Sequence, residues 1–190
     1  MRKLGKWLLR VLAFLLILII IIVIAAYFYI RPGEPIGWPP KVEVSLMERL
    51  EQMVHNRSLR LQLKEDEINA LGAEFMEKTE PYRTYKQQWN ITGMRMRLDN
   101  DAVNIDVQAE AFAGVQAGVR VSYKLEWNES TQTIRAIPEG THVKELTVPQ
   151  SWLKLKPLEF PLASQLPAWV KIKRVEFTAD GWWLTLGLKL

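Results

Sequence analysis

An uninterrupted apolar run from Val11 to Ile30 is the feature that most constrains how this chain folds. Its 20 residues, at about 1.5 Å per helical residue, span about 30 Å, which is the thickness of the hydrocarbon layer of a bilayer. No face of the run is polar, so it is not the amphipathic helix that covers the core of a soluble domain. We therefore expect residues 11–30 to form a transmembrane helix in contact with the lipid bilayer.

The charges on either side of the run predict its orientation. Basic residues before the run outnumber those just after it, where only Arg31 follows closely; the preceding ones are Arg2, Lys3, Lys6 and Arg10. The positive-inside rule then places residues 1–10, a basic tail, in the cytoplasm and residues 31–190 outside. A cleaved signal peptide is the alternative, because Val23-Ile24-Ala25 loosely satisfies the small-residue rule, but the run is longer than a typical signal-peptide core. We expect a single-pass protein of the cell membrane.

A proline-rich segment over residues 31–41 separates this run from the rest of the chain. Proline fixes φ and lacks a backbone donor, so the segment predicts a stiff, extended linker that stands between the membrane and one extracytoplasmic domain, residues 42–190. The whole chain has a net charge of +4, but beyond Arg31 there are 20 basic residues against all 21 acidic ones. A near-neutral domain lacks the basic excess that displaces counterions from phosphate, so we expect no nucleic-acid partner.

The domain sequence alternates between apolar and polar residues with the period of half-buried strands. The alternating segments are 58–63, 94–98, 103–111, 115–127, 133–137, 170–179 and 182–190. Turns are predicted at 99–101, 128–132 and Asp180-Gly181. Apolar stripes with helical spacing predict short helices over 45–55 and 65–79, and loops with one helical turn, at 161–166, over 148–168. The predicted fold class is α+β: an N-terminal transmembrane helix plus a curved antiparallel sheet with one or two helices on its apolar face.

Residue types that carry out catalysis are sparse. There is no cysteine, and the two histidines, His55 and His142, have no nucleophile pattern around them. Asp106 falls on the polar side of a predicted strand, where we expect it to be solvated rather than paired with a second carboxyl group for glycoside hydrolysis. We therefore expect a protein that is not an enzyme and that holds no cofactor and no metal.

The apolar residues suggest a different kind of site. Two short helices of about 17 and 22 Å can just cover a small sheet, or leave part of it open as a groove for a lipid or another apolar ligand. The candidate groove residues are Phe75, Trp152, Leu155, Leu158, Phe160, Leu162 and Leu166. A loop folded onto the core explains the 152–166 set equally well. The alternative function is a non-catalytic scaffold or interaction subunit of an envelope complex, whose partner is another envelope protein.

Two short segments resemble known families. The Leu-Thr-Val-Pro step at Leu146–Pro149, after the long strands, resembles the YpmS-like family of membrane-anchored proteins of Gram-positive bacteria. The stretch from Lys64 to Leu71 resembles a helix start in TULIP-like extracytoplasmic lipid-binding families, where the cap position is usually Ser or Thr and Lys64 departs from that pattern. The resemblance implies a cell-surface, membrane-tethered protein of the cell envelope and brings no catalytic residue with it.

Overall fold

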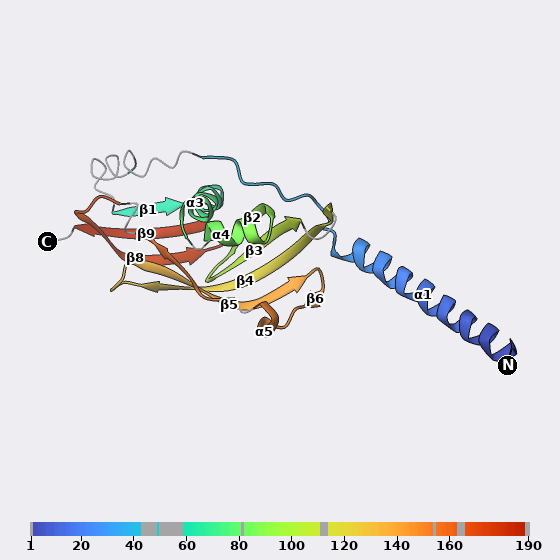
Figure 1. Cartoon of the computed structure of the whole chain (residues 1–190). Coiled ribbons are helices and arrows are strands. Elements are labelled where there is room, and N and C mark those ends of the chain that lie inside the picture. Colours follow the sequence, from blue (N-terminus) through green and yellow to red (C-terminus); the bar gives the residue numbers. More distant parts are fainter. Residues whose placement is uncertain are drawn as a thin grey trace.

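The computed structural model describes residues 2–42, 49, 59–80, 82–110, 114–153, 155–162 and 166–188. The fold is α+β, with an N-terminal apolar helix, antiparallel sheets and shorter helices. Helix α1 (Arg2–Ile30) projects away from the domain, and the mean hydropathy of its Val11–Ile30 segment is 3.3 (Figure 1). The expected helix is therefore present, although it begins earlier, at Arg2. The helix predicted over 45–55 lies outside the described residues, apart from Arg49.

The larger sheet is the meander that the alternation predicts. Its strands run in the order β2-β3-β4-β5-β6, with a short strand, β7, on β5; their bounds are Ile91–Asp99, Ala102–Glu110, Gln116–Asn128, Thr133–Val143, Leu146–Thr147 and, for β7, Leu158–Pro161. Strand β5 is longer than predicted because it passes Pro138, where its register against β4 shifts. Its first half pairs with β7 and its end with β6. The prediction of loops over 148–168 missed β7 and the short helix α5 (Gln150–Leu153). Residues 163–165 of the helical turn predicted at 161–166 lie outside the described residues.

The C-terminal hairpin belongs to a second sheet. Its strands, β8 (Val170–Thr178) and β9 (Gly181–Leu188), pair as predicted, and β1 (Arg60–Leu63) pairs with the other edge of β9. The prediction of a single sheet was therefore wrong. Alternation assigns a residue to one face of a strand but carries no information about which strand lies alongside.

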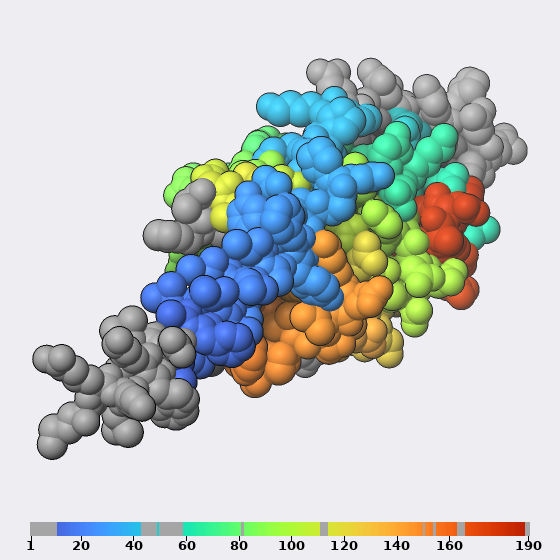
Figure 2. All heavy atoms as spheres, turned by 90° about the vertical axis from the view of Figure 1, so that its right-hand side faces the viewer, coloured from blue at the N-terminus to red at the C-terminus, as the bar shows by residue number. Residues whose placement is uncertain are grey.

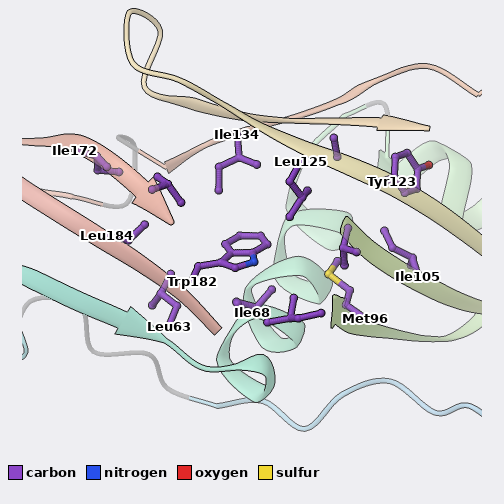
Figure 3. Close-up of a cluster of buried hydrophobic side chains, with 14 of the residues drawn as sticks. Leu63, Ile68, Met96, Ile105, Tyr123, Leu125, Ile134, Ile172, Trp182 and Leu184 are labelled. Carbon is purple, nitrogen blue, oxygen red and sulfur yellow. The ribbon is translucent and has the colours of Figure 1, made fainter. Parts of the chain in front are cut away.

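A single apolar core joins the two sheets to α3 (Glu65–Lys78). Side chains from both sheets and from α3 meet there, with the indole ring of Trp182 at the centre of the view (Figure 3). The side chains include Leu63, Ile68, Met96, Ile105, Leu125, Ile134, Ile172 and Leu184. Helix α3 was predicted from its apolar stripe and acidic first turn, and the Lys64 backbone N–H donates to Glu67 Oε2 at 2.8 Å to start it.

The outer edge of β2 is closed by side chains of α3. Asn69 Nδ2 donates to the Met96 carbonyl at 2.8 Å, and Asn69 Oδ1 accepts from the Met96 N–H at 2.6 Å. The Leu98 N–H donates to Glu65 Oε2 at 3.1 Å. An open strand edge invites pairing with other chains, so these bonds both fix α3 on the sheet and protect its edge.

The proline-rich linker continues this closure. It has no regular secondary structure, as expected, but it packs on the sheet rather than standing free. The Gly37 carbonyl accepts from the Met94 N–H at 3.3 Å, and the Ile36 N–H donates to Gln108 Oε1 at 2.6 Å. Trp38 packs against the core, and Lys86 of α4 (Tyr82–Gln88) lies 4.1 Å from the centroid of its ring.

Two glycines, one on each side of Gln108 in the sheet, make room for the linker. Gly93, Gln108 and Gly118 are partners across β2, β3 and β4. A Cβ atom on Gly93 would lie 1.7 Å from the carbonyl oxygen of Ile36, and one on Gly118 would lie 3.1 Å from Cβ of Pro32. The two glycines therefore let the linker cross the sheet at backbone distance.

Asp106 on β3 is buried, contrary to the solvated position expected for it. Its carboxylate accepts from Arg120 Nε at 2.6 Å and lies 3.2 Å from Arg97 Nη2. These cations come from β4 and β2, the two neighbours of β3. The ion pair with Asp106 raises the pKa of the Arg120 guanidinium.

Candidate functional site

An apolar cavity of about 220 Å³ lies between α3 and the two sheets. It receives side chains from α3, from the core strands of both sheets and from the β7 region. The residues that line it are Leu63, Ile68, Leu71, Gly72, Glu74, Phe75, Lys78, Thr79, Met96, Val103, Ile105, Leu125, Ala136, Phe160, Pro161, Leu162 and Trp182. Polar lining comes from the C-terminal half of α3, so the cavity is apolar within and polar at this rim.

The shape of the cavity depends on small residues that face large ones. Gly72 lies where α3 approaches β2, and a Cβ there would lie 2.3 Å from Cε of Met96. Ala136 of β5 is fully buried and lines the same cavity. Either position with a larger side chain would fill part of the space, so the volume follows from these two residues as well as from the helix position.

Aromatic rings form one wall. The ring of Phe75 lies 4.8 Å from that of Phe160 and 5.0 Å from that of Tyr82, measured between centroids. Tyr82 belongs to α4, a helix that the sequence analysis did not predict, and its ring continues to Tyr85 at 6.4 Å. Tyr82 packs on Phe75 without lining the cavity itself, and burial raises the pKa of its phenol above the usual value of 10.0.

Trp182 brings a polar group to the otherwise apolar part of the lining that the structure describes. Its side chain is buried, and its indole Nε1 has no hydrogen-bond partner among the described residues. An unpaired buried donor costs about 1–3 kcal/mol. Tyr123 lies in the same core, and burial raises the pKa of its phenol to about 12.

The structure separates the seven candidate groove residues into three groups. Phe75, Phe160 and Leu162 line the cavity. Leu155, Leu158 and Leu166 are half-buried and pack against the core without being lining residues; Trp152 is 77% exposed and also lies outside the lining. The structure therefore brings Phe75 of α3 together with Phe160 and Leu162 around one cavity, and it leaves the other candidate residues of the 152–166 segment outside the lining.

Sequence reasoning missed the deeper lining, such as Met96, Ala136 and Trp182. These residues occupy inward positions of the predicted strands, so the alternation placed them on the correct face. The same alternation does not distinguish a residue that borders a cavity from one in the packed core. The sequence held one indication of a cavity, which is the small residue Ala136 at an inward position of a predicted strand.

Comparison of the chain with protein-family models, with curated proteins and with solved structures found no match. The resemblance to the YpmS-like family therefore stays a prediction, and the function must be argued from the cavity and the apolar helix α1.

Proposed function

We propose that this chain is a membrane-tethered, non-enzymatic protein of the cell envelope that holds an apolar ligand, such as one lipid acyl chain, beneath α3. The observation that carries the proposal is the cavity of about 220 Å³ with its almost wholly apolar lining. A well-packed core leaves few voids larger than a water molecule, so a cavity of this size is a departure that a ligand would explain. A sheet curved around α3, as predicted, would hold such a ligand on its concave side.

The volume restricts the ligand. An apolar cavity of about 150 Å³ holds benzene, whereas pockets for drug-sized molecules are about 300–1,000 Å³. A cavity of about 220 Å³ therefore suits the end of one acyl chain or a small ring system, not a whole two-chain lipid. The remainder of a lipid would lie beyond the rim formed by Glu74, Lys78 and Thr79, where polar side chains suit a headgroup.

The apolar lining favours a ligand that is bound by burial, at about 0.8 kcal/mol for each methylene group. An acyl chain that enters from the rim would place its carbonyl group near Glu74, Lys78 and Thr79 and its methyl end in the apolar interior. The proposed ligand class is therefore a mono-acyl or otherwise slender apolar molecule.

Tethering is proposed from α1. The Val11–Ile30 segment is long and apolar enough to cross a membrane, and a signal sequence passes the same test. The length of the run and the basic residues before it favour an uncleaved anchor with the N-terminus in the cytoplasm and the domain outside. A lipid-binding domain beside a bilayer would have its ligand within reach.

Native mass spectrometry of the full chain, released from mild detergent, tests the ligand. Lipid bound around α1 is a background that a matched pair of variants removes. Ala136→Leu fills the cavity, whereas Ala102→Leu adds the same atoms at a position of β3, in the same sheet, that does not line it. We expect a lipid adduct in the wild type and in Ala102→Leu that is lost in Ala136→Leu. Equal adducts in all three proteins would refute a ligand in the cavity.

One observation favours the alternative, a scaffold subunit of an envelope complex. The cavity is smaller than most ligand pockets, so it is also compatible with a core that stays empty. In that case the exposed surfaces of the domain would bind another envelope protein. Crosslinking in intact cells would then recover one stable partner equally well with the wild type and with Ala136→Leu.

A further inference from the structure

The outer end of α1 is attached to the domain. Lys144, in the turn between β5 and β6, donates from Nζ to the carbonyl oxygen of Phe28 at 3.5 Å, and it lies 5.3 Å from the centroid of the Tyr29 ring. Pro32 lies against Gly118 of β4, and the linker then packs across β3 and β2. Because these contacts follow one another without a gap, the orientation of the domain relative to α1 is set by the fold.

This attachment fixes the position of the β5–β6 turn relative to the outer end of α1. With α1 anchored as proposed above, Phe28 lies two residues before the end of the apolar run and marks the outer boundary of the hydrocarbon. The ammonium of Lys144 is held at that boundary, and its backbone lies one lysine side chain away. Leu146 follows by two residues, so its backbone lies within about 7 Å of that of Lys144 at about 3.3 Å per residue. The headgroup layer is about 5–7 Å thick on each side of the hydrocarbon, so a turn that is held to Phe28 through one lysine side chain lies next to this layer.

Exposed apolar side chains gather at this end of the domain. Leu146 is 60% exposed, and Trp152 of α5, at 77%, is the most exposed large apolar side chain among the described residues. Figure 1 places β6 and α5 on the side of the domain from which α1 leaves, and Figure 2, viewed from that side, shows the orange segment that contains them directly beside the blue end of α1.

We propose that the β5–β6 turn and α5 form a second membrane contact, in which Leu146 and Trp152 lie in the lipid headgroup layer of the bilayer that holds α1. The proposal rests on the anchoring proposed above, and it is independent of the cavity. Tryptophan suits this layer because its ring is apolar and its indole N–H remains hydrogen-bonded. Lys144, which is held at the Phe28 carbonyl, brings a positive charge close to the anionic headgroups. The contact holds the domain down on the membrane surface.

Probes at single cysteines test this contact, because the chain has no cysteine of its own. The full chain is reconstituted in vesicles of phosphatidylcholine and phosphatidylglycerol and labelled with an environment-sensitive fluorophore at Leu146→Cys. The matched control is Leu188→Cys, since Leu188 is also 60% exposed and ends β9 at the far end of the domain (Figure 1). We expect lipids with a nitroxide near the headgroup to quench most of the fluorescence at position 146 and little at position 188. A probe at Trp152→Cys should behave like the one at 146.

A third probe separates this proposal from the anchoring. At Ile20→Cys, in the middle of the apolar run, lipids with a nitroxide deep in the acyl chain should quench the fluorescence. Quenching at 20 but equal, weak quenching at 146 and 188 would overturn the second contact and leave the anchor intact. A probe at 146 that is shielded from both lipid nitroxide and aqueous iodide would also overturn it, because a protein would then cover the surface. No quenching at 20 would overturn the anchor and the contact together.

Discussion

Replacing Gly93 by alanine should release the linker from the sheet. An alanine Cβ would lie 1.7 Å from the carbonyl oxygen of Ile36 and 2.5 Å from its carbonyl carbon. Both are backbone atoms, so no side-chain rotation relieves the overlap. Carbon and oxygen approach to about 3.3 Å even in close contacts, so the linker must move away by about 1.5 Å.

That movement breaks the two hydrogen bonds that hold the linker. They are the bond from the Ile36 N–H to Gln108 Oε1, at 2.6 Å, and the bond from the Met94 N–H to the Gly37 carbonyl, at 3.3 Å. At about 1 kcal/mol each, their loss costs about 2 kcal/mol. The prolines of the linker limit the backbone entropy that its release regains. Since about 1.4 kcal/mol is a factor of ten, the detached fraction should rise about 30-fold.

Hydrogen exchange of the full chain in detergent micelles measures this change. The amides of Ile36 and Met94 lose their acceptors and should exchange about 30-fold faster in Gly93→Ala than in the wild type, for the 2 kcal/mol lost; peptides within residues 31–42 and 91–99 report them. The matched control is Gly37→Ala, because a Cβ on Gly37 meets nothing within 4 Å. Unchanged exchange in Gly93→Ala would refute the reasoning, and so would equal acceleration in the two variants.

Three further changes follow from buried polar groups. Asp106→Asn removes the carboxylate that pairs with Arg120, and it should lower the free energy of unfolding by about 1–3 kcal/mol in urea titrations; no change would mean that the pair is neutral to stability. Asn69→Ala leaves the Met96 N–H and carbonyl unpaired and should cost about 2–4 kcal/mol in the same assay, unless water replaces the amide. Burial raises the pKa of Tyr123 to about 12 from 10.0, so the unfolded chain loses this proton first. The free energy of unfolding should therefore fall from about pH 10 to about pH 12, and Tyr123→Phe should remove that part of the pH dependence.

Local patterns predicted the elements of this fold well because each depends on neighbouring residues alone. The strands from β2 to β5 and the β8–β9 hairpin follow from period-two alternation, and α3 follows from its apolar stripe. The pairing of β1 with β9 was not predictable in the same way. Leu61 lies opposite Leu184, far along the chain, and many other inward leucines offer an equivalent face.

The candidate site was predicted in part for a related reason. Phe75 lies on a helix whose apolar face was evident, and Phe160 and Leu162 line the same cavity. Trp152 was assigned to the groove because it precedes them in a proline-rich, apolar segment. Such a segment has no hydrophobic periodicity, so the neighbouring residues do not indicate that Trp152 faces outward while Phe160 faces inward.

The composition of the linker and its contacts place the N-terminal boundary of the domain at different residues. Its prolines and polar residues suggest a spacer, and prolines indeed leave few N–H groups for regular pairing. The residues between the prolines make the contacts instead: Ile36 donates to Gln108, and Gly37 accepts from Met94 at the edge of β2. Since α3 bonds to the rest of that edge through Asn69, the linker and the helix together complete one sheet boundary. A segment that completes a sheet edge also connects the sheet to α1, so the same contacts that protect the edge of β2 set the orientation of the domain relative to α1.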